Sequence, residues 1–348
     1  MFSECTNLES IKIGKGVASI GNNVFYLCNK LKSVYISDLG SWFNIFGNVN
    51  YQFLSDYHLF LNGDEIKDLV IPSTIKSIPD YVFAGCIGLT SIIIPNSVTS
   101  IGCGAFQNCS SLTSINISQN VTSIGDWAFS GCCELPSISI PQSVTNIGSG
   151  AFSGCSCLSS IIIPNNVTSI GKSVFENCTS LIEINIPKSI TTICEYAFYG
   201  CSSLSSIIIP DSVIDIWECA FKNCISLSTI DIPNSVKLIR PGVFWGCSNL
   251  KSVSLPDNLQ SINESLFADC SSLVSITIPS TVTHIYNSAF KYCKSLSSIE
   301  LPDGVVELYP YAFQGCSNLL SIILPKSVNY IRNFAFADCS NLVLQDLV

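Results

Sequence analysis

Apolar and polar residues recur along this chain with a fixed period of 23 residues. The repeating unit is clearest at residues 89–111, where it is LTSIIIPNSVTSIGCGAFQNCSS. With Leu89 as position 1, a leucine occupies that position at every 23rd residue as far as Leu342, and no residue is gained or lost on the way. A period of this length is typical of a solenoid, in which each repeat packs only against its neighbours. The pattern therefore predicts a stack of about 14 coils.

Each unit contains two short segments with the alternation of a β-strand. Residues 91–94 alternate polar and apolar side chains, which predicts a strand with one buried face that pairs in parallel with the next coil. Proline at position 7 ends this strand. Val98 and Ile101 bracket two polar residues and predict a shorter strand on the opposite wall, closed by Gly102. The remaining Ala-Phe-x-x-Cys segment is expected to form one helical turn.

Phenylalanine and cysteine each form a ladder. Fourteen of the 19 phenylalanines share position 18, from Phe2 and Phe25 to Phe336, and burying each should contribute roughly 2 to 3 kcal/mol. Fourteen of the 19 cysteines share position 21. Stacked Cβ atoms would lie about 4.8 Å apart, beyond the ~3.8 Å that a disulfide prefers, so buried and unbridged thiols are expected. The ladder cysteines are Cys5, Cys28, Cys86, Cys109, Cys132, Cys155, Cys178, Cys201, Cys224, Cys247, Cys270, Cys293, Cys316 and Cys339.

Five further cysteines lie outside the ladder. They are Cys103, Cys133, Cys157, Cys194 and Cys219. Cys194 with Cys219, and Cys133 with Cys157, occupy nearly equivalent places on successive coils. Either pair could form a bridge, and the sequence leaves this open.

One unit breaks the period. We expect a single solenoid domain over residues 1–348, in which residues 31–65 form an irregular longer repeat with a 12-residue insertion. Its aromatic residues either form a local core that lets the extra residues rejoin the stack, which we favour, or a ligand surface. They are Trp42, Phe43, Phe46, Tyr51, Phe53, Tyr57 and Phe60.

Composition and charge exclude several classes of partner. The net charge is −9, and no basic stripe is present to neutralise phosphates, so nucleic acid is not expected. The longest aliphatic runs are far shorter than the roughly 18 residues that cross a bilayer, so no membrane insertion is expected. No signal peptide is visible in this chain. Neither terminus carries a polar cap, which predicts a monomer or end-to-end association through uncapped termini.

Candidate catalytic residues are sparse. His58 and His284 are the only histidines; His58 is expected to pack on aromatics and His284 to be a solvated strand residue. Asp231 and Glu300 share position 5 but are three coils apart, about 14 Å, too far for the paired carboxylates of a glycosidase. The thiol ladder lacks the paired C-x-x-C arrangement of zinc sites. We therefore expect no enzyme, no metal site and no cofactor.

The unit L-x-x-I-x-I-P-x-x-V-x-x-I-G-x-x-A-F-x-x-C-x-x-L resembles the BspA-like, or Treponema pallidum type, leucine-rich repeat. This resemblance implies a leucine-rich-repeat solenoid: one parallel concave sheet, short convex strands and helical turns in a right-handed curved stack. It also implies a cell-surface or secreted protein of bacteria or parasitic protists, and an adhesion role toward matrix proteins or other cells. No catalytic residues come with the resemblance.

The predicted binding surface is the concave sheet, which presents positions 3 and 5. Position 5 varies within an otherwise uniform frame, as a surface for a protein or glycan ligand requires, although drift on a solvated face gives the same pattern. We centre the site on Ile162, Asn185, Ile208 and Asp231. A weaker candidate lies at Tyr286, Tyr309 and Tyr311. The alternative function is an intracellular or structural interaction scaffold, which unpaired thiols would favour.

Overall fold

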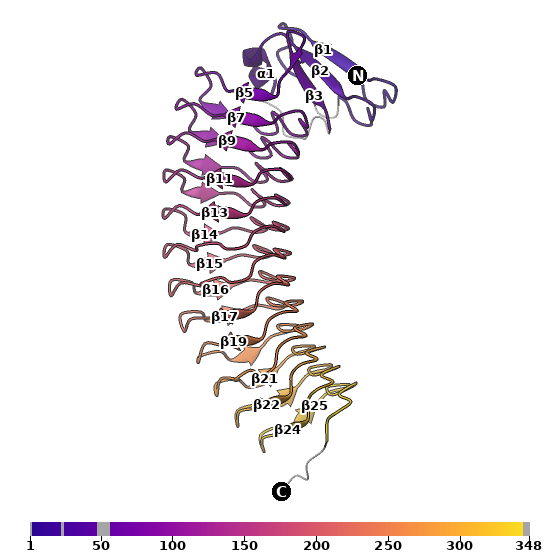
Figure 1. Ribbon diagram of the computed structural model, residues 1–348, viewed down its shortest axis with the longest axis vertical. Helices are drawn as coiled ribbons and strands as arrows, with labels where there is room; N and C mark the ends of the chain where they lie inside the picture. Colours follow the sequence, from indigo (N-terminus) through magenta and orange to yellow (C-terminus); the bar gives the residue numbers. More distant parts are fainter. Residues whose placement is uncertain (1, 22–23, 47–55, 344–348) are drawn as a thin grey trace. The chain divides into compact units, whose positions relative to one another are not determined.

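The computed structural model describes residues 2–21, 24–46 and 56–343 and divides into two compact units. Unit 1 is Met1–Val167 and unit 2 is Thr168–Val348. Each unit is a stack of coils with short parallel strands, which confirms the predicted leucine-rich-repeat solenoid (Figure 1). A single domain over residues 1–348 stays a prediction.

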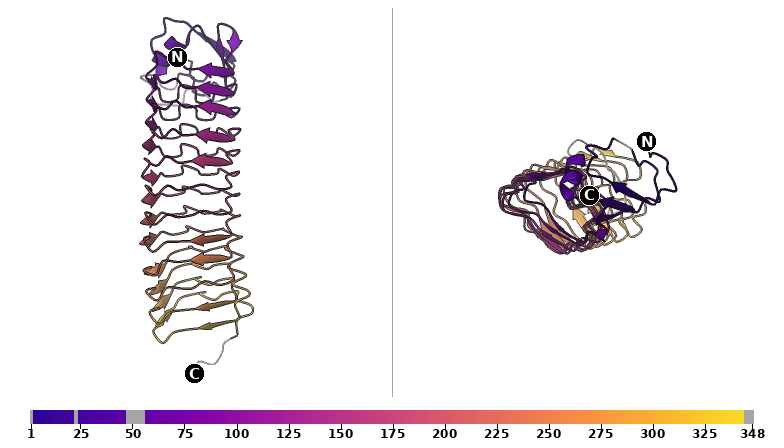
Figure 2. Two further views of the ribbon diagram at one scale, coloured as in Figure 1. Left: turned by 60° about the vertical axis from the view of Figure 1, so that its left-hand side comes forward. Right: turned by 90° about the horizontal axis from the view of Figure 1, so that it is seen from above.

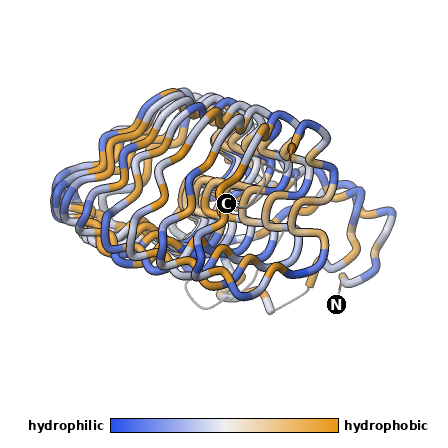
Figure 3. Tube along the Cα trace, turned by 90° about the horizontal axis from the view of Figure 1, so that it is seen from below, coloured by the Kyte–Doolittle hydropathy of each residue, from blue (hydrophilic) through white to orange (hydrophobic). Residues whose placement is uncertain are grey.

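Every regular coil contributes to three walls. Positions 3 to 5 form the first wall, which is the predicted concave sheet; positions 12 and 13 form the second wall, and positions 14 to 21 form the turn wall. Figure 2 shows strands along both sides of the coils. Hydrophobic and hydrophilic residues alternate along the Cα trace of the coils (Figure 3).

The first wall of unit 1 holds two parallel ladders. Ser91 pairs with Ser114 and Ile92 with Ile115, which is the register that a 23-residue period demands. Position 4 points inward, and positions 3 and 5 face outward. The strands are β5 (Asp68–Val70), β7 (Ser91–Ile93) and β9 (Ser114–Asn116), then β11 (Ser137–Ser139) and β13 (Ser160–Ile162).

The first wall of unit 2 is less continuous. Two separate pairs form there, and the equivalent segments 206–208 and 275–277 carry no ladder of their own beyond one isolated bridge between Asn185 and Ile208. The sheet is therefore a series of short ladders. Its strands are β17 (Thr229–Asp231) with β19 (Ser252–Ser254), and β22 (Ser298–Glu300) with β24 (Ser321–Ile323).

The second wall is built from two-residue strands, as the bracketing apolar pair predicted. In unit 1 they form one four-stranded sheet and in unit 2 two such sheets. The unit 1 strands are β6 (Ser77–Ile78), β8 (Ser100–Ile101), β10 (Ser123–Ile124) and β12 (Asn146–Ile147). The unit 2 strands are β14 (Ser169–Ile170), β15 (Thr192–Ile193), β16 (Asp215–Ile216), β18 (Leu238–Ile239), β20 (Ser261–Ile262), β21 (His284–Ile285), β23 (Glu307–Leu308) and β25 (Tyr330–Ile331).

The turn wall is not helical, so the predicted helical turn is wrong. Gly104 and Asn108 have φ angles of 56° and 57°, in the left-handed region that interrupts a right-handed helix. The N–H of Gln107 donates to the carbonyl of Gly104 at 3.0 Å, which closes a β-turn rather than a helical bond. The N–H of Phe106 instead donates to Ala128 of the next coil at 2.8 Å. Backbone donors that a helix would keep internal thus join neighbouring coils.

The core contains the two predicted ladders. Phe198 and Phe221 stack with ring centroids 5.2 Å apart, and both side chains are fully buried. The thiol of Cys247 donates to the carbonyl of Phe221 in the preceding coil at 3.1 Å, and Cys109 contacts Phe83 likewise at 3.2 Å. These thiols are free, as predicted, because each is held in a hydrogen bond to backbone. Phe2 is an exception, since it is exposed.

Burial also keeps thiols in the middle of the ladder protonated. It raises the pKa values of Cys155 and Cys247 to about 12. Deprotonated thiol is the reactive form, so these residues are unreactive at neutral pH. The proposed bridges outside the ladder are not formed: Cys133, Cys157, Cys194 and Cys219 are all free.

The longer repeat at the start of unit 1 contains the one α-helix that the described residues form, α1 (Leu39–Phe46). Asp38 caps it, because its carboxylate accepts hydrogen bonds from the N–H and hydroxyl of Ser41 at 2.9 and 2.7 Å. These bonds lower the pKa of Asp38. The accompanying strands are β1 (Ser10–Ile13), β2 (Ser33–Ile36), β3 (His58–Leu61) and β4 (Asp64–Glu65).

The aromatic residues of this repeat are mostly core. Trp42 is fully buried and donates to the carbonyl of Val82 at 3.0 Å, and the ring of Phe43 meets Phe83 edge-on at 5.6 Å. The predicted local core is therefore continuous with the phenylalanine ladder. Phe60 stacks on Tyr35 at 4.7 Å. Two of the predicted members, Tyr51 and Phe53, lie outside the described residues.

Candidate functional site

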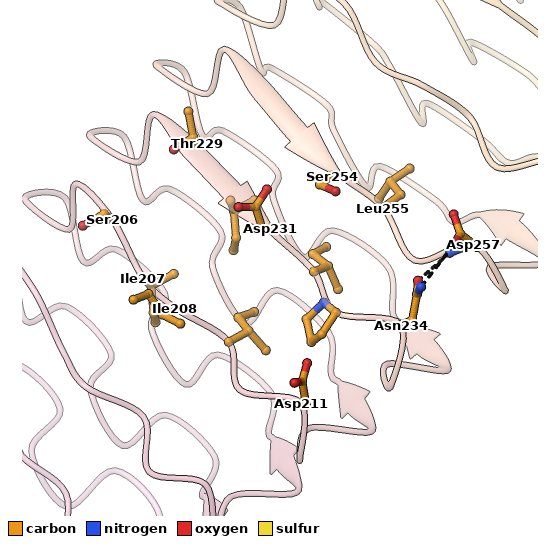
Figure 4. Close-up of a pocket in the computed structure, with 14 residues that line it drawn as sticks. Ser206, Ile207, Ile208, Asp211, Thr229, Asp231, Asn234, Ser254, Leu255 and Asp257 are labelled. Atoms are coloured by element: carbon orange, nitrogen blue, oxygen red, sulfur yellow. Dashed lines mark hydrogen bonds between the residues drawn. The ribbon is translucent and has the colours of Figure 1, made fainter.

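A hollow opens on the first wall of unit 2 where the strand ladder is interrupted. It lies between segment 206–209, which carries no strand, and the paired strands β17 and β19 (Figure 4). Its volume of about 560 Å³ falls in the range of ligand pockets. Among the described residues, no strand ladder joins segment 206–208 to β17 at this point.

Two of the four predicted site residues line this hollow. Ile208 and Asp231 occupy position 5 of successive coils, and both face outward. Ile208 is 82% exposed, the largest exposed fraction of any large apolar residue that the structure describes. The neighbouring Ile207 and Ile209 are buried, as strand alternation requires. An apolar side chain that faces water beside a hollow is free to pack against a partner.

The other two predicted residues lie elsewhere. Asn185 is exposed on the preceding coil of unit 2, where it forms the isolated bridge to Ile208 without lining the hollow. Ile162 belongs to β13 in unit 1 and is exposed there. The predicted group of four is thus divided between the two units, and unit 2 brings three of them together on adjacent coils.

The rim of the hollow is acidic. Asp211 and Asp257 join Asp231 in the lining, and no lysine or arginine does. Asp257 accepts a hydrogen bond from the amide of Asn234 at 3.1 Å, and its own N–H donates to Asn234 at 2.9 Å. None of the three carboxylates takes part in an ion pair among the described residues. The hollow therefore presents uncompensated negative charge around an apolar surface.

Sequence reasoning missed Asp211, Asn234 and Asp257. All three occupy position 8, directly after the proline, where they were taken only as turn residues. The signal that could have found them is their spacing, since position 8 of three consecutive coils carries Asp, Asn and Asp beside the variable position 5. The polar residues at position 8 lie beside position 5 and therefore enlarge the candidate binding surface of the first wall.

A second, smaller hollow repeats this arrangement further along unit 2. It has a volume of about 320 Å³ and is lined by residues 275–278 and by β22 with Glu300. Segment 275–277 again carries no strand. Open ladders and hollows therefore coincide at both places.

The histidines differ from their predicted surroundings. The Nδ1 atom of His58 lies 2.5 Å from a carboxylate oxygen of Glu65, so its main partner is an acid and not an aromatic ring. His284 is half-buried, with its ring centroid 5.8 Å from that of Tyr286 and 6.2 Å from that of Tyr309. It lies in strand β21, as predicted, but it is only partly solvated, because position 14 of its own and of the next coil carries a tyrosine.

The turn wall of unit 2 adds a surface that the sequence did not suggest. The ammonium of Lys222 lies 3.4 Å above the ring of Trp245 and 6.0 Å from that of Tyr199. The indole N–H of Trp245 donates to Asp269 at 2.9 Å. The charged and aromatic groups of this cluster therefore already contact one another through a cation–π interaction and a hydrogen bond.

The lining of the hollow contains no histidine, cysteine or lysine, and its ionisable side chains are those of Asp211, Asp231 and Asp257. Across the described part of the chain, no three histidine, cysteine or acidic residues are placed to hold a metal ion. No described helix has the length and apolar character needed to cross a membrane.

Comparisons with known proteins agree with this architecture. The sequence profile of the BspA type leucine rich repeat region matches residues 1–49, 55–182, 168–297 and 260–346, in six copies. A leucine-rich repeat protein from Bacteroides ovatus is 30% identical with a TM-score of 0.62, over 78% of this chain and 85% of that one. A leucine rich cell surface protein from Faecalibacterium prausnitzii is 35% identical with a TM-score of 0.58, over 80% and 86%. No curated protein matches the sequence.

Proposed function

Because the chain belongs to the BspA type leucine-rich repeat family, as its repeat pattern predicted, we propose that it is a non-enzymatic binding module of a cell-surface or secreted protein. Its partner is a matrix protein or the surface of another cell, and its role is adhesion. A relative of 35% identity is named a cell surface protein, which supports this location. The family as a whole supports an interaction role.

We place the contact on the first wall of unit 2, around Ile208 and Asp231. The exposure of Ile208 beside the larger hollow is the observation that carries this choice. Buried apolar contacts at the centre of an interface provide most of the binding energy, and the polar rim provides specificity. Asn185 extends the same surface by one coil.

The test is a binding screen of the full chain against immobilised matrix proteins, mucins and whole bacterial cells. The variant Ile208→Lys should then weaken any binding at least tenfold, because a charge would have to be buried in the contact. Leu238→Lys is the matched control, since Leu238 is exposed on the second wall in β18. Equal loss in both variants, or silence against all three probes, would refute the proposal.

The second candidate is an intracellular scaffold, which the free thiols favour. Exposed Cys157 and half-buried Cys194 would meet oxidants outside the cell, whereas a reducing compartment would preserve them. Antibody labelling of intact and permeabilised producing cells separates the two. Labelling only after permeabilisation would select the scaffold.

A further inference from the structure

The two hollows of unit 2 repeat each other at an interval of three coils. Residues 207–209 of the larger hollow correspond to 276–278 of the smaller one, and Asp231 corresponds to Glu300. In each case the carboxylate stands at position 5 of the coil that follows an unpaired segment. The same structural opening therefore occurs twice on one wall, each time with an acid at the same place.

Charge defines what these openings accept. Neither lining includes a lysine or arginine, and Asp231 and Glu300 take part in no ion pair among the described residues. Lys251, at position 2 of the first of the two coils between them, is the basic residue of this stretch that lies closest in sequence to the first-wall strands. Like charges disfavour an acidic partner, whereas a basic group is attracted to both openings.

Each hollow includes apolar side chains in a partly polar lining. Ile207 and Ile209 line the larger one, Ile276 and Ile278 the smaller, and the exposed Ile208 stands beside Asp231. Lysine and arginine side chains lay their methylene stems along apolar surface while the charged group reaches an acid. This combination favours a long basic side chain over a small inorganic cation.

The interval between the openings selects the spacing of such side chains. Three coils at ladder spacing measure about 14 Å, and somewhat more where the ladder is open. In an extended chain, side chains on one face recur every second residue, so same-face distances are about 7, 14 and 20 Å for two, four and six residues. Only the four-residue spacing matches the two openings.

We propose that the first wall of unit 2 binds an extended, basic polypeptide segment that carries lysine or arginine at residues i and i+4, one for each hollow. This inference rests on the proposed function and names the chemistry of the partner. The segment runs across the strands, along the direction in which the coils stack. Its basic groups contact Asp231 and Glu300, and its backbone passes over the two coils between them.

The experiment uses a synthetic peptide of alternating threonine and valine with lysines at its second and sixth residues, labelled with fluorescein. Fluorescence polarisation with the full chain measures its affinity at low and at high ionic strength. We expect it to bind roughly fivefold more tightly than the same composition with lysines at the second and fifth residues, and to weaken with salt. Asp231→Asn and Glu300→Gln should each remove this preference.

Asp215→Asn is the control, because it makes the same charge change on the second wall, in β16. Equal affinity of the two peptides, or equal loss in the control variant, would overturn the inference. Neutral mucin oligosaccharides provide a further test. If they displace the peptide from the two charge variants as well as from the native chain, the hollows bind a glycan and the inference is overturned. If a screened partner is lost in Ile208→Lys but unchanged in the double charge variant, the proposed function stands and this inference fails.

Discussion

The turn wall and the first wall of unit 2 are built from the same coils but join them differently. On the turn wall, the N–H of Phe198 donates to Ala220 at 2.8 Å and that of Phe221 to Val243 at 3.0 Å, and the pattern continues coil after coil. On the first wall, only two pairs of strands form ladders. The turn wall thus carries a regular series of backbone hydrogen bonds between coils, whereas the strand ladders of the first wall are interrupted. Stability and recognition can therefore reside in different positions of one repeat.

Alkaline pH should have the largest effect on the free energy of unfolding. Burial raises the pKa of Cys247 to about 12, so the folded chain holds this proton at pH values where the unfolded chain, with an ordinary thiol, has lost it. The stability that results is complete below the unfolded pKa and is lost as pH rises from about 9 toward 12. Each such thiol should cost about 1.4 kcal/mol per pH unit in that window. Urea unfolding at a series of pH values measures it.

The contribution of a single thiol can be isolated. Cys247→Val should reduce the slope of unfolding free energy against pH by about 1.4 kcal/mol per unit between pH 9 and 12. Val236→Ala, a buried change in the same coil, should lower stability equally at every pH. An unchanged slope in the cysteine variant would show that its thiol is not buried as described.

Removing a rung of the aromatic ladder is the next largest change. Phe198→Ala should lower the free energy of unfolding by about 3 to 5 kcal/mol, because the ring is fully buried and stacks on Phe221. Each coil contacts only its neighbours, so amide hydrogen exchange should accelerate first in the adjoining coils. A melting temperature equal to that of the native chain would contradict the ladder.

The turn wall of unit 1 offers a smaller and more specific test. Gly150 has a φ of 62°, and a Cβ atom there would overlap the ring of Trp127 from the preceding coil. Gly150→Ala should cost about 2 to 3 kcal/mol, the sum of a strained backbone and an overpacked contact. Thermal unfolding measures the difference.

Gly154→Ala provides the control, because it has a similar φ of 73° but a Cβ there would meet nothing closer than 3.6 Å. It should cost only about 1 kcal/mol. The double variant Gly150→Ala with Trp127→Ala should recover part of the loss through relief of the overlap. Equal losses in the two single variants would mean that only the backbone angle matters.

The first wall should give the smallest effect. Ile208→Ala is expected to change the unfolding free energy by less than about 0.5 kcal/mol, since the side chain is mostly exposed. Its neighbour Ile207 is buried, and Ile207→Ala should cost about 2 to 4 kcal/mol. Urea unfolding of the two variants measures the difference. Similar losses of unfolding free energy would contradict the alternation of buried and exposed side chains.

The period alone was sufficient to predict the two strand-bearing walls and the phenylalanine and cysteine ladders. A strict 23-residue repeat fixes which residues pair, so Ser91 had to face Ser114, and apolar position 4 had to point inward. The position of Phe198 and Cys247 in the core follows from the same arithmetic. Regular repetition converts a local pattern into tertiary contacts, which is why so much of this fold is visible in the sequence.

The turn wall could not be predicted, because its left-handed positions carry no consistent residue type. Gly104 and Gly150 suit a positive φ, but Trp127, Tyr196 and Cys219 adopt it at the same position. Hydrogen bonds to the next coil stabilise these backbone angles, and such bonds have no signature within one repeat.

The hollows were equally invisible. The tripeptide Ser-Ile-Ile forms a strand at residues 91–93, 160–162 and 321–323, yet at 206–208 it pairs only through one isolated bridge. The residues are the same, so the tripeptide alone does not decide the pairing. The variability of position 5 predicts a recognition surface there, and two of its residues, Ile208 and Asp231, line the hollow. The opening itself depends on contacts that accumulate over several coils.

The hydrogen bonds of the turn wall give unit 2 a mechanical character. Those of Phe244 and Phe267 run from one coil to the next at 3.1 and 2.8 Å and all point the same way. Tension along the stacking direction would pull such bonds open in line, coil by coil, and would not shear a long ladder at once. Each detached coil would release roughly 80 Å of extended chain. Under tension, unit 2 would therefore unfold in small steps and extend before a bound partner is released.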